Sequence, residues 1–272
     1  MGPTMKLPEG HQRFLDAVLP QIQRDERFVG LAAGGSLLAG DVDEFSDLDL
    51  VPVVDPDHHK SVMAQRFDIT ASWGRQLAAF TGDHVGEPRL VVCLYEDPLL
   101  HVDFKFVTPP ELETRIEDPL VLWERSTELT DAIDRTESHH PMPDLHWIED
   151  RFWVWVHYAA AKLGRGELFE VVDFLGFMRS QVLGPLALVS AGHLPRRVRR
   201  LETYVPAFAE SLQATVATYD VKACGDAVWT CVRLYRILRD QLAPADLIRR
   251  TAAEEASVAY LEKVRITGGS PR

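Results

Sequence analysis

The stretch that decides the fold is AAGGSLLAGDVDEFSDLDLVPVV, residues 32–54. Two glycines and a serine follow one apolar run, and Asp47 and Asp49 stand two residues apart at the head of another. Alternate residues of a β-strand point to the same face, so we expect these carboxylates side by side, with Leu48 and Leu50 turned toward the core. Like charges held this close raise each other's pKa unless a cation neutralises them. Mg²⁺, which prefers oxygen ligands, is the natural neutralising cation.

A third carboxylate lies on a later predicted strand, HVDFKFV at residues 101–107. Apolar and polar residues alternate along it, and Asp103 stands in the middle of the polar face. If this strand lies beside the strand of Asp47 and Asp49, the three carboxylates form a cluster able to hold two metal ions. Two such ions can activate an attacking oxygen and stabilise a leaving phosphate in an in-line displacement. Lys105, on the same polar face, either balances this cluster or forms an ordinary ion pair.

The glycine turn supplies the complementary part of a phosphate site. Gly34 and Gly35 allow backbone amides to approach a ligand closely, and Ser36 adds a hydroxyl at the start of a helix. This combination suits a triphosphate. The plainer alternative is a simple turn, with the aspartates as ordinary strand residues that cap nearby backbone or face solvent.

Length and composition bound the remaining possibilities. The chain has 272 residues, 46% hydrophobic and 26% charged, as expected for a globular protein of one large or two modest domains. Its net charge of −12 argues against nucleic acid as a partner and is compatible with a cationic small substrate. We find no run of about eighteen apolar residues and no signal-peptide pattern, so we expect a cytoplasmic protein that does not interact with a membrane. Cys93, Cys224 and Cys231 have the spacing of neither a metal site nor a redox pair, which predicts buried free thiols.

The sequence pattern changes from mixed to helical near residue 140. The segment ESHHPMPD, residues 137–144, has two prolines and no periodicity, so we interpret it as a linker. The elements predicted before it are a helix at 8–26, strands at 27–34 and 48–54, a helix from Pro56 through Phe80, and strands at 89–96, 99–107 and 120–126. The helices predicted after it are 146–164, 167–190, 196–218, 221–241 and 244–263. These elements predict an α+β fold, with an N-terminal mixed sheet flanked by helices and a C-terminal all-α helical bundle.

The motifs resemble the signature of the polymerase-beta-type nucleotidyltransferase superfamily. GGSLLAG at 34–40 and DEFSDLDLV at 43–51 are similar to its glycine-glycine-serine and serine-aspartate-x-aspartate elements, and Asp103 to its third aspartate on a later strand. In the helical half, Lys162 and the turn at 165–166 resemble the C-terminal domain of antibiotic nucleotidyltransferases, the aminoglycoside adenylyltransferase and lincosamide nucleotidyltransferase group.

This resemblance implies a nucleotidyltransferase domain at residues 1–138 and a helical substrate-binding domain at residues 145–272. It implies that the protein, with two Mg²⁺ ions, transfers AMP from ATP to a hydroxyl of a small acceptor and releases pyrophosphate. The implied acceptor is an aminoglycoside-like antibiotic, so the implied role is antibiotic resistance. The residues carried over are the catalytic and metal-binding aspartates, Asp47, Asp49 and Asp103, and the nucleotide-binding residues, Gly35, Ser36 and Lys162.

Several alternatives stay open. Lys162 either binds triphosphate or extends to the surface of an apolar helix. Similar domains also act as antitoxins that adenylylate or bind a partner protein, or as nucleotide-binding modules without turnover. Candidates for a separate general base in the helical half are Glu167, Glu170 and Asp173. The donor base, the acceptor hydroxyl and the oligomeric state are not determined by the sequence.

Overall fold

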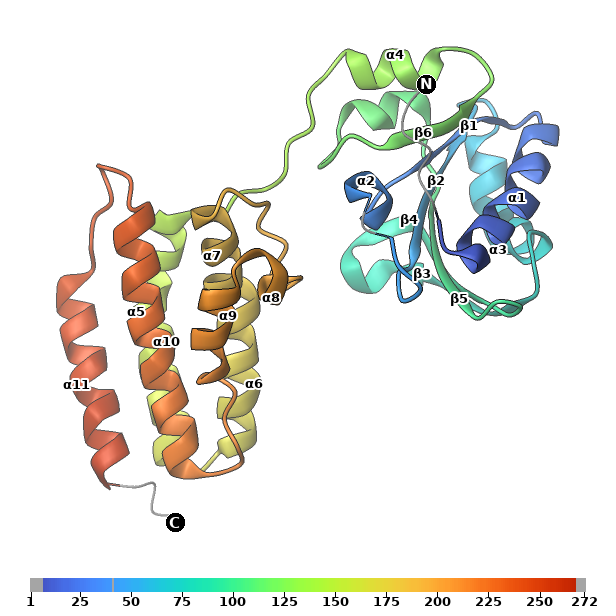
Figure 1. The fold of residues 1–272 in the computed structure, drawn as a ribbon. Coiled ribbons are helices and arrows are strands. Elements are labelled where there is room, and N and C mark those ends of the chain that lie inside the picture. The colour runs from blue at the N-terminus through green and yellow to red at the C-terminus, as the bar shows by residue number, and fades with distance from the viewer. Residues whose placement is uncertain (1–6, 41, 268–272) are drawn as a thin grey trace. The chain divides into compact units, whose positions relative to one another are not determined.

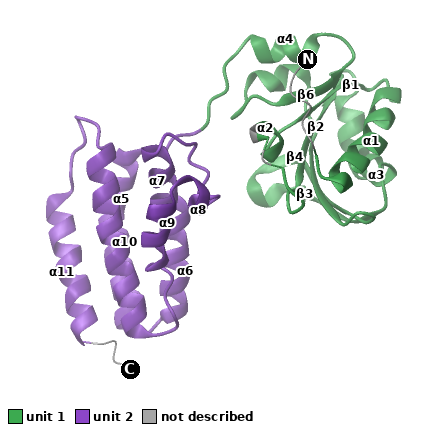
Figure 2. Ribbon diagram, viewed as in Figure 1, with its two compact units in different colours: residues 1–140 green, residues 141–272 purple. Residues whose placement is uncertain are grey.

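The computed structural model describes residues 7–40 and 42–267 and consists of two compact units, residues 1–140 and 141–272 (Figure 2). Unit 1 contains a six-stranded mixed sheet with helices, and unit 2 is built from helices (Figure 1). The α+β fold predicted from the sequence is therefore confirmed.

The sheet of unit 1 has the strand order β3-β4-β5-β2-β1-β6. Strands β2 and β5 run parallel, and the other neighbouring strands run antiparallel. The elements of unit 1 are α1 (Glu9–Arg24), β1 (Phe28–Ala33), α2 (Ser36–Ala39), β2 (Leu48–Val54), α3 (His59–Ser72), β3 (Gln76–Gly82), η1 (Asp83–Val85), β4 (Glu87–Tyr95), β5 (Leu100–Lys105), η2 (Pro109–Glu113), β6 (Leu120–Glu124) and α4 (Glu128–Asp134).

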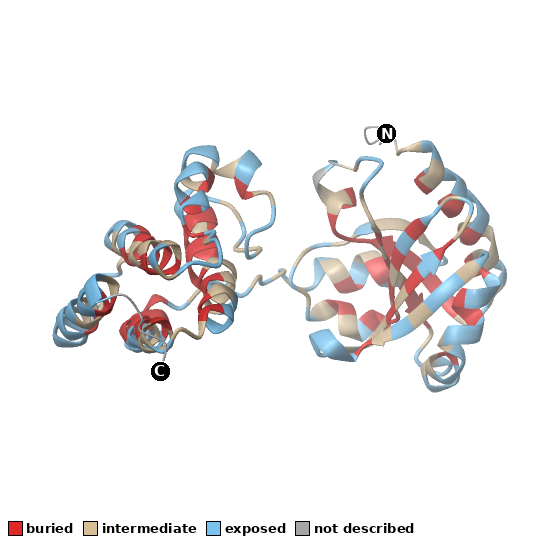
Figure 3. Ribbon diagram, turned by 90° about the horizontal axis from the view of Figure 1, so that it is seen from below, coloured by how far each residue is buried: buried red, intermediate tan, exposed pale blue. Residues whose placement is uncertain are grey.

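Helices α1 and α3 cover one face of this sheet (Figure 1). The apolar side of α1, from Phe14 to Ile22, packs against the inward residues of the strands, among them Val102 and Phe104, which are fully buried. Buried and more exposed residues alternate along β5, as the two-residue repeat of a strand requires, whereas β1 is buried throughout. Figure 3 shows the buried residues of unit 1 gathered on the strands and on the helix sides that face them. On the other face, a smaller core under η2 and α4, centred on Leu129, covers one end of the sheet. The rest of that face carries the polar residues of β2 and β5.

The helix predicted from Pro56 through Phe80 is wrong in its second half. Helix α3 ends at Ser72, and residues 76–82 form the edge strand β3. A Cβ on Gly74 would lie 3.1 Å from the Tyr95 ring, so glycine allows the chain to turn closely past that ring. Pairing with β4 then supplies the backbone hydrogen bonds of β3 and overrides the helical propensity of its alanines.

Unit 2 is a bundle of helices around one apolar core. Helix α6 continues through a π-helical turn, 179–183, into α7, so the predicted helix 167–190 is nearly continuous. The predicted helix 196–218 is instead two short helices, because Pro206 lacks the amide that a continuous helix needs and begins α9. The predicted helix 244–263 begins only after the segment that follows Pro244. The elements are α5 (Leu145–Gly164), α6 (Leu168–Met178), α7 (Gly184–Ser190), α8 (Leu201–Tyr204), α9 (Pro206–Gln213), α10 (Val221–Leu242) and α11 (Thr251–Thr267).

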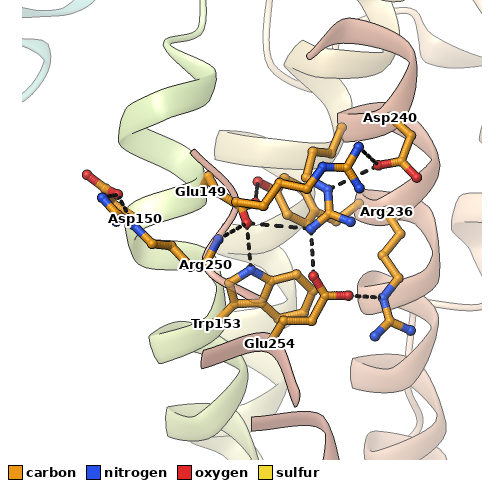
Figure 4. Close-up of polar contacts among 10 residues, drawn as sticks. Glu149, Asp150, Trp153, Arg236, Asp240, Arg250 and Glu254 are labelled. Atoms are coloured by element: carbon orange, nitrogen blue, oxygen red, sulfur yellow. Dashed lines mark hydrogen bonds and ion pairs between the residues drawn. The ribbon is translucent and has the colours of Figure 1, made fainter. Parts of the chain in front are cut away.

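A buried polar network ties three of these helices together (Figure 4). Glu149 of α5 is fully buried and accepts hydrogen bonds from the Trp153 indole (3.0 Å), the Tyr235 hydroxyl (2.6 Å) and the Arg250 backbone amide (3.0 Å). Arg239 of α10 lies 3.5 Å from Glu149 and 2.7 Å from Glu254 of α11. Because every buried charge here has polar partners, the network joins α5, α10 and α11 without leaving a charge uncompensated.

The sequence also predicted buried free cysteines and no apolar run long enough to cross a membrane. Cys93, Cys224 and Cys231 are buried free thiols, as predicted. The stretch Leu168–Ser190 is, by length and composition alone, long and apolar enough to cross a membrane, and 56% of an 18-residue window within it is buried inside the structure. A helix at the centre of a bundle has the same composition, because its apolar residues face neighbouring helices on several sides.

Candidate active site

Two carboxylates of the candidate site are neighbours across the parallel strand pair. Asp49 on β2 is in register with Asp103 on β5, and both side chains are half-buried. The adjacent residues on both strands, such as Leu50 and Phe104, are buried in the opposite face. Asp47 directly precedes β2, and its charge acts on Asp103. The structure therefore places Asp49 and Asp103 side by side, with Asp47 near enough for its charge to act on Asp103.

Burial is the main cause that raises the pKa of Asp103 above its usual value, and the negative charge of Asp47 raises it further. Two histidines oppose this shift. The Nε2 atom of His101 lies 2.9 Å from Asp103 Oδ1, and His84 of η1 acts through its charge. Sequence reasoning missed both histidines as partners of Asp103. The alternation along β5 already placed His101 on the polar face, but nothing in the sequence located His84.

The glycine turn and Asp49 are fitted to each other. The Gly34 amide donates a hydrogen bond to the backbone oxygen of Asp49 at 2.9 Å. Gly35 has φ 61° and ψ −133°, and a Cβ on it would lie 1.8 Å from Asp49 Oδ2. A side chain at position 35 is excluded both by backbone conformation and by space. The turn therefore requires glycine because the Asp49 carboxylate lies directly over its backbone.

The turn has a further carboxylate partner that the sequence did not indicate. The Gly35 amide donates a hydrogen bond to Glu117 Oε1 at 3.2 Å, across 82 residues of chain. Glu117 lies in the irregular segment between η2 and β6, where no periodicity signals its position. The hydroxyl oxygen of Ser36 is buried and makes no hydrogen bond within the described part of the chain. The turn thus presents two groups. The Gly35 amide already binds an anionic oxygen, and the buried Ser36 hydroxyl is suited to bind a second polar group.

These residues fit a hard divalent cation. Asp47, Asp49 and Asp103 offer carboxylate oxygens, and burial, the main cause, raises the pKa of Asp103 although His101 lies beside it. In residues 7–40 and 42–267, no three His, Cys, Asp or Glu side chains gather closely enough to form a metal group on their own. Mg²⁺ is commonly held by one or two carboxylates together with waters and substrate phosphates, so such a closed group is not required.

An ion-pair network lies at the far end of β4 and β5. Glu87 contacts Arg89 at 2.7 Å and Lys105 at 2.9 Å, and Arg89 also contacts Glu111 at 2.8 Å. The hydrogen bond from Arg89, followed by that from Lys105, lowers the pKa of Glu87 to about 2. Of the two alternatives for Lys105, the structure therefore shows an ordinary ion pair.

Lys162, the predicted nucleotide-binding residue of the helical half, lies at the end of α5 in unit 2. Its ammonium donates to Glu167 at 2.5 Å and lies 5.3 Å from the centre of the Tyr158 ring. The hydrogen bond to Glu167 raises the pKa of Lys162 and lowers that of Glu167. Glu170, another base candidate, accepts a hydrogen bond from the Tyr158 hydroxyl. The described contacts of Lys162 thus lie within its own unit, and its role toward nucleotide stays a prediction.

The chain is similar to solved structures of nucleotidyltransferase type. One is an aminoglycoside 6-adenyltransferase from Bacillus subtilis, at 18% sequence identity and a TM-score of 0.41, with 94% of this chain and 99% of that chain covered. Another is a nucleotidyltransferase-like protein from Exiguobacterium sibiricum 255-15, at 11% identity and a TM-score of 0.39, with 94% of this chain and 88% of that chain covered. No family model and no curated protein matches the chain.

Proposed function

We propose that the protein is a nucleotidyltransferase that transfers AMP from ATP to a hydroxyl of a small acceptor and releases pyrophosphate. One observation carries the proposal: Asp49 and Asp103 are in register on parallel strands, directly beside a turn that only glycine can form. In the proposal, the carboxylate oxygens bind metal and the amides of the adjacent turn bind phosphate, which is what phosphoryl transfer by positioning and charge neutralisation requires.

Each residue has a distinct part in the proposed reaction. The Gly35 amide and the Ser36 hydroxyl donate hydrogen bonds to phosphate oxygens. Asp47 and Asp49 hold the Mg²⁺–triphosphate complex, and Asp103 faces the attacking hydroxyl. Bound Mg²⁺ would neutralise the carboxylates and draw electron density from the phosphate oxygens.

The transfer itself exchanges one bond for another. The acceptor oxygen forms a bond to the α-phosphorus while the bond from that phosphorus to pyrophosphate breaks. Pyrophosphate leaves with the electron pair. The proton of the hydroxyl passes to a carboxylate, and Asp103, whose pKa is raised by burial, is suited to accept it.

The acceptor in this proposal is an aminoglycoside-like antibiotic, and the role is resistance. The net charge of −12 supports a polycationic acceptor, because an acidic protein attracts and concentrates cations. The three buried free thiols support a reducing compartment, the cytoplasm, as the place of action.

The test follows transfer directly. The protein is incubated with ATP, Mg²⁺ and a panel of aminoglycoside and lincosamide acceptors, while pyrophosphate release is measured and products are identified by mass spectrometry. We expect an acceptor whose mass increases by one AMP, and release that stops when Mg²⁺ is chelated. AMP found on a co-purified protein instead would indicate the antitoxin-type alternative, and ATP binding without any release would contradict an enzyme.

The variant Asp103→Asn separates binding from chemistry. It keeps the shape of the side chain but removes its charge, so ATP affinity should change only a few-fold while single-turnover transfer falls by at least ~10²-fold. Asp68→Asn is the matched control, because Asp68 is exposed on α3, which covers the opposite face of the sheet. Equal transfer by Asp103→Asn and wild type would assign Asp103 a structural role.

Lys162 is tested in the same way. If its ammonium binds the triphosphate, Lys162→Met should weaken ATP binding by about 10-fold, the loss of one charge-assisted hydrogen bond. Glu167→Gln removes the carboxylate that pairs with Lys162 and leaves the Lys162 ammonium unchanged, so that variant should not weaken ATP binding. Unchanged affinity in Lys162→Met would show that Lys162 only stabilises the end of α5.

A further inference from the structure

The face of the sheet that carries Asp103 continues beyond it onto two further strands. Across a strand pair, residues in register point to the same face of the sheet. Asp103 on β5 is in register with Val92 on β4, and Val92 is in register with Phe80 on β3. Together with Asp49, these residues form one row across four strands, and each step of the row spans ~4.8 Å.

Apolar side chains occupy the outer part of this face. Phe80 is 52% exposed and Leu94 37% exposed, whereas Val91 and Cys93, on the other face of β4, are buried. Ala78 is exposed and is in register with Leu94, and Leu94 is in register with His101. We call Ala78, Phe80, Val92 and Leu94 the apolar shelf. It places a phenylalanine and a leucine in water within about 10 Å of Asp103, two strand spacings along the row.

The order of groups along the row decides what the shelf faces. The glycine turn follows β1. Across the sheet from β1, the next groups are Asp49 on β2, then Asp103 on β5, and then the shelf on β4 and β3. In an in-line displacement the attacking and leaving oxygens lie on opposite sides of the phosphorus. If the glycine turn binds the phosphates that leave, the attacking hydroxyl enters from the side of Asp103 that is away from the turn. The shelf lies on that side.

We propose that the apolar shelf binds the acceptor, and that the acceptor is an amphipathic aminosugar. Its hydroxyl lies at Asp103, its ammonium group in the field of the three aspartates, and an alkyl or aryl substituent on the shelf. This inference rests on the proposed function and makes its acceptor more specific, because a fully polar polycation would leave Phe80 and Leu94 in water. The ring of His84, 5.6 Å from the Phe80 ring, borders the same surface.

The test compares two ligands that differ only in apolar length: methyl and hexyl 2-amino-2-deoxy-β-D-glucopyranoside. Binding is measured by calorimetry on the full chain with Mg²⁺ and the non-transferable analogue α,β-methylene-ATP. Burial of two or three methylenes on the shelf predicts at least ~10-fold tighter binding of the hexyl glycoside. Phe80→Ser should reduce this preference to within ~3-fold, and Phe80→Leu should retain it.

Phe67→Ser is the matched control, because Phe67 is a 38% exposed phenylalanine on α3, which covers the opposite face. It should keep the wild-type preference, and all variants should keep wild-type affinity for the ATP analogue. Equal affinity for the two glycosides, no binding of either, or a preference that survives in Phe80→Ser would overturn the shelf assignment. Failure of wild type to bind the ATP analogue would instead contradict the proposed function, so the two failures are distinguishable.

Discussion

The close approach of Asp49 to the glycine turn can be tested by three single alanine substitutions. Gly35→Ala combines a positive φ of 61° with a Cβ placed 1.8 Å from Asp49 Oδ2 and 2.8 Å from its Cγ. Gly40→Ala has a similar φ of 68°, but a Cβ there meets no atom of the described residues within 4 Å. Gly34→Ala meets only ordinary contacts, 3.5 Å from Glu117 Oε1 and 3.7 Å from Asp49 Cβ. The three variants therefore separate backbone strain from collision with the carboxylate.

The expected magnitudes follow from these contacts. A backbone conformation such as that of Gly35, reserved for glycine, costs an L-residue about 1–3 kcal/mol. Displacing the Asp49 side chain from its rotamer adds about 1 kcal/mol, so Gly35→Ala should destabilise unit 1 by roughly 2–4 kcal/mol. Gly40→Ala, in the left-handed helical region, should cost about 1 kcal/mol, and Gly34→Ala close to none.

Stability is measured by hydrogen exchange of β1 and β2 peptides across a urea titration of the full chain, and binding by calorimetry with Mg²⁺ and ATP. Because Asp49 must move in Gly35→Ala alone, only that variant should lose metal-dependent ATP binding, by at least ~10²-fold. If Gly35→Ala matches Gly40→Ala in both measurements, the carboxylate has room to move and the reasoning fails.

Three further predictions follow from other contacts of the structure. Glu117→Gln removes the negative charge that lies beside the Gly35 amide. It should tighten ATP binding about fivefold in calorimetry, because about 1 kcal/mol of repulsion between Glu117 and the phosphates is relieved. Glu87 has a folded-state pKa of about 2, below its ordinary 4.5, so its ion pairs contribute fully above pH 4.5 and lose their effect as pH falls toward 2. Glu87→Gln should therefore reduce the unfolding free energy by roughly 1–2 kcal/mol at pH 7, a value discounted for solvent screening, and should match wild type near pH 2 in urea titrations. Glu149→Gln should destabilise unit 2 by about 3 kcal/mol, because the buried Arg239 loses part of its compensation, whereas Asp240→Asn at an exposed ion pair should cost under about 1 kcal/mol.

Each of these has a clear contrary result. Weaker ATP binding in Glu117→Gln would mean that this carboxylate supports the site instead of competing for it. A difference between Glu87→Gln and wild type that does not change with pH would point to lost packing. Equal stabilities of Glu149→Gln and Asp240→Asn would show that the network of Figure 4 contributes little.

The sequence predicted the centre of unit 1 well because its signals are local. The turn at Gly35, the alternation along β2 and the polar face of β5 are all visible within a few residues of chain. Strand β3 was missed for the opposite reason. Its QLAAF segment favours a helix by composition, and only pairing with β4, a tertiary contact, makes it a strand.

The candidate site shows the same division. That Asp49 and Asp103 are neighbours was a hypothesis from the sequence, because parallel pairing of residues 54 positions apart leaves no local mark. Glu117 could not be predicted at all, because it reaches Gly35 from an irregular segment. Residues marked by a local pattern, in a strand or in the glycine turn, were accessible to sequence reasoning, and Glu117, in a segment without such a pattern, was not.

The side-by-side placement of Asp49 and Asp103 has an evolutionary consequence. Carboxylates in register on neighbouring strands repel each other, and burial, followed by the charge of Asp47, adds to the disadvantage of the ionised Asp103. An asparagine at either position would relieve that repulsion and make the free protein more stable, while removing a charge that the proposed reaction uses. Under the proposed function, selection for thermal stability alone would therefore favour inactive sequences at these two positions. Retention of both aspartates would then require selection for the proposed reaction itself.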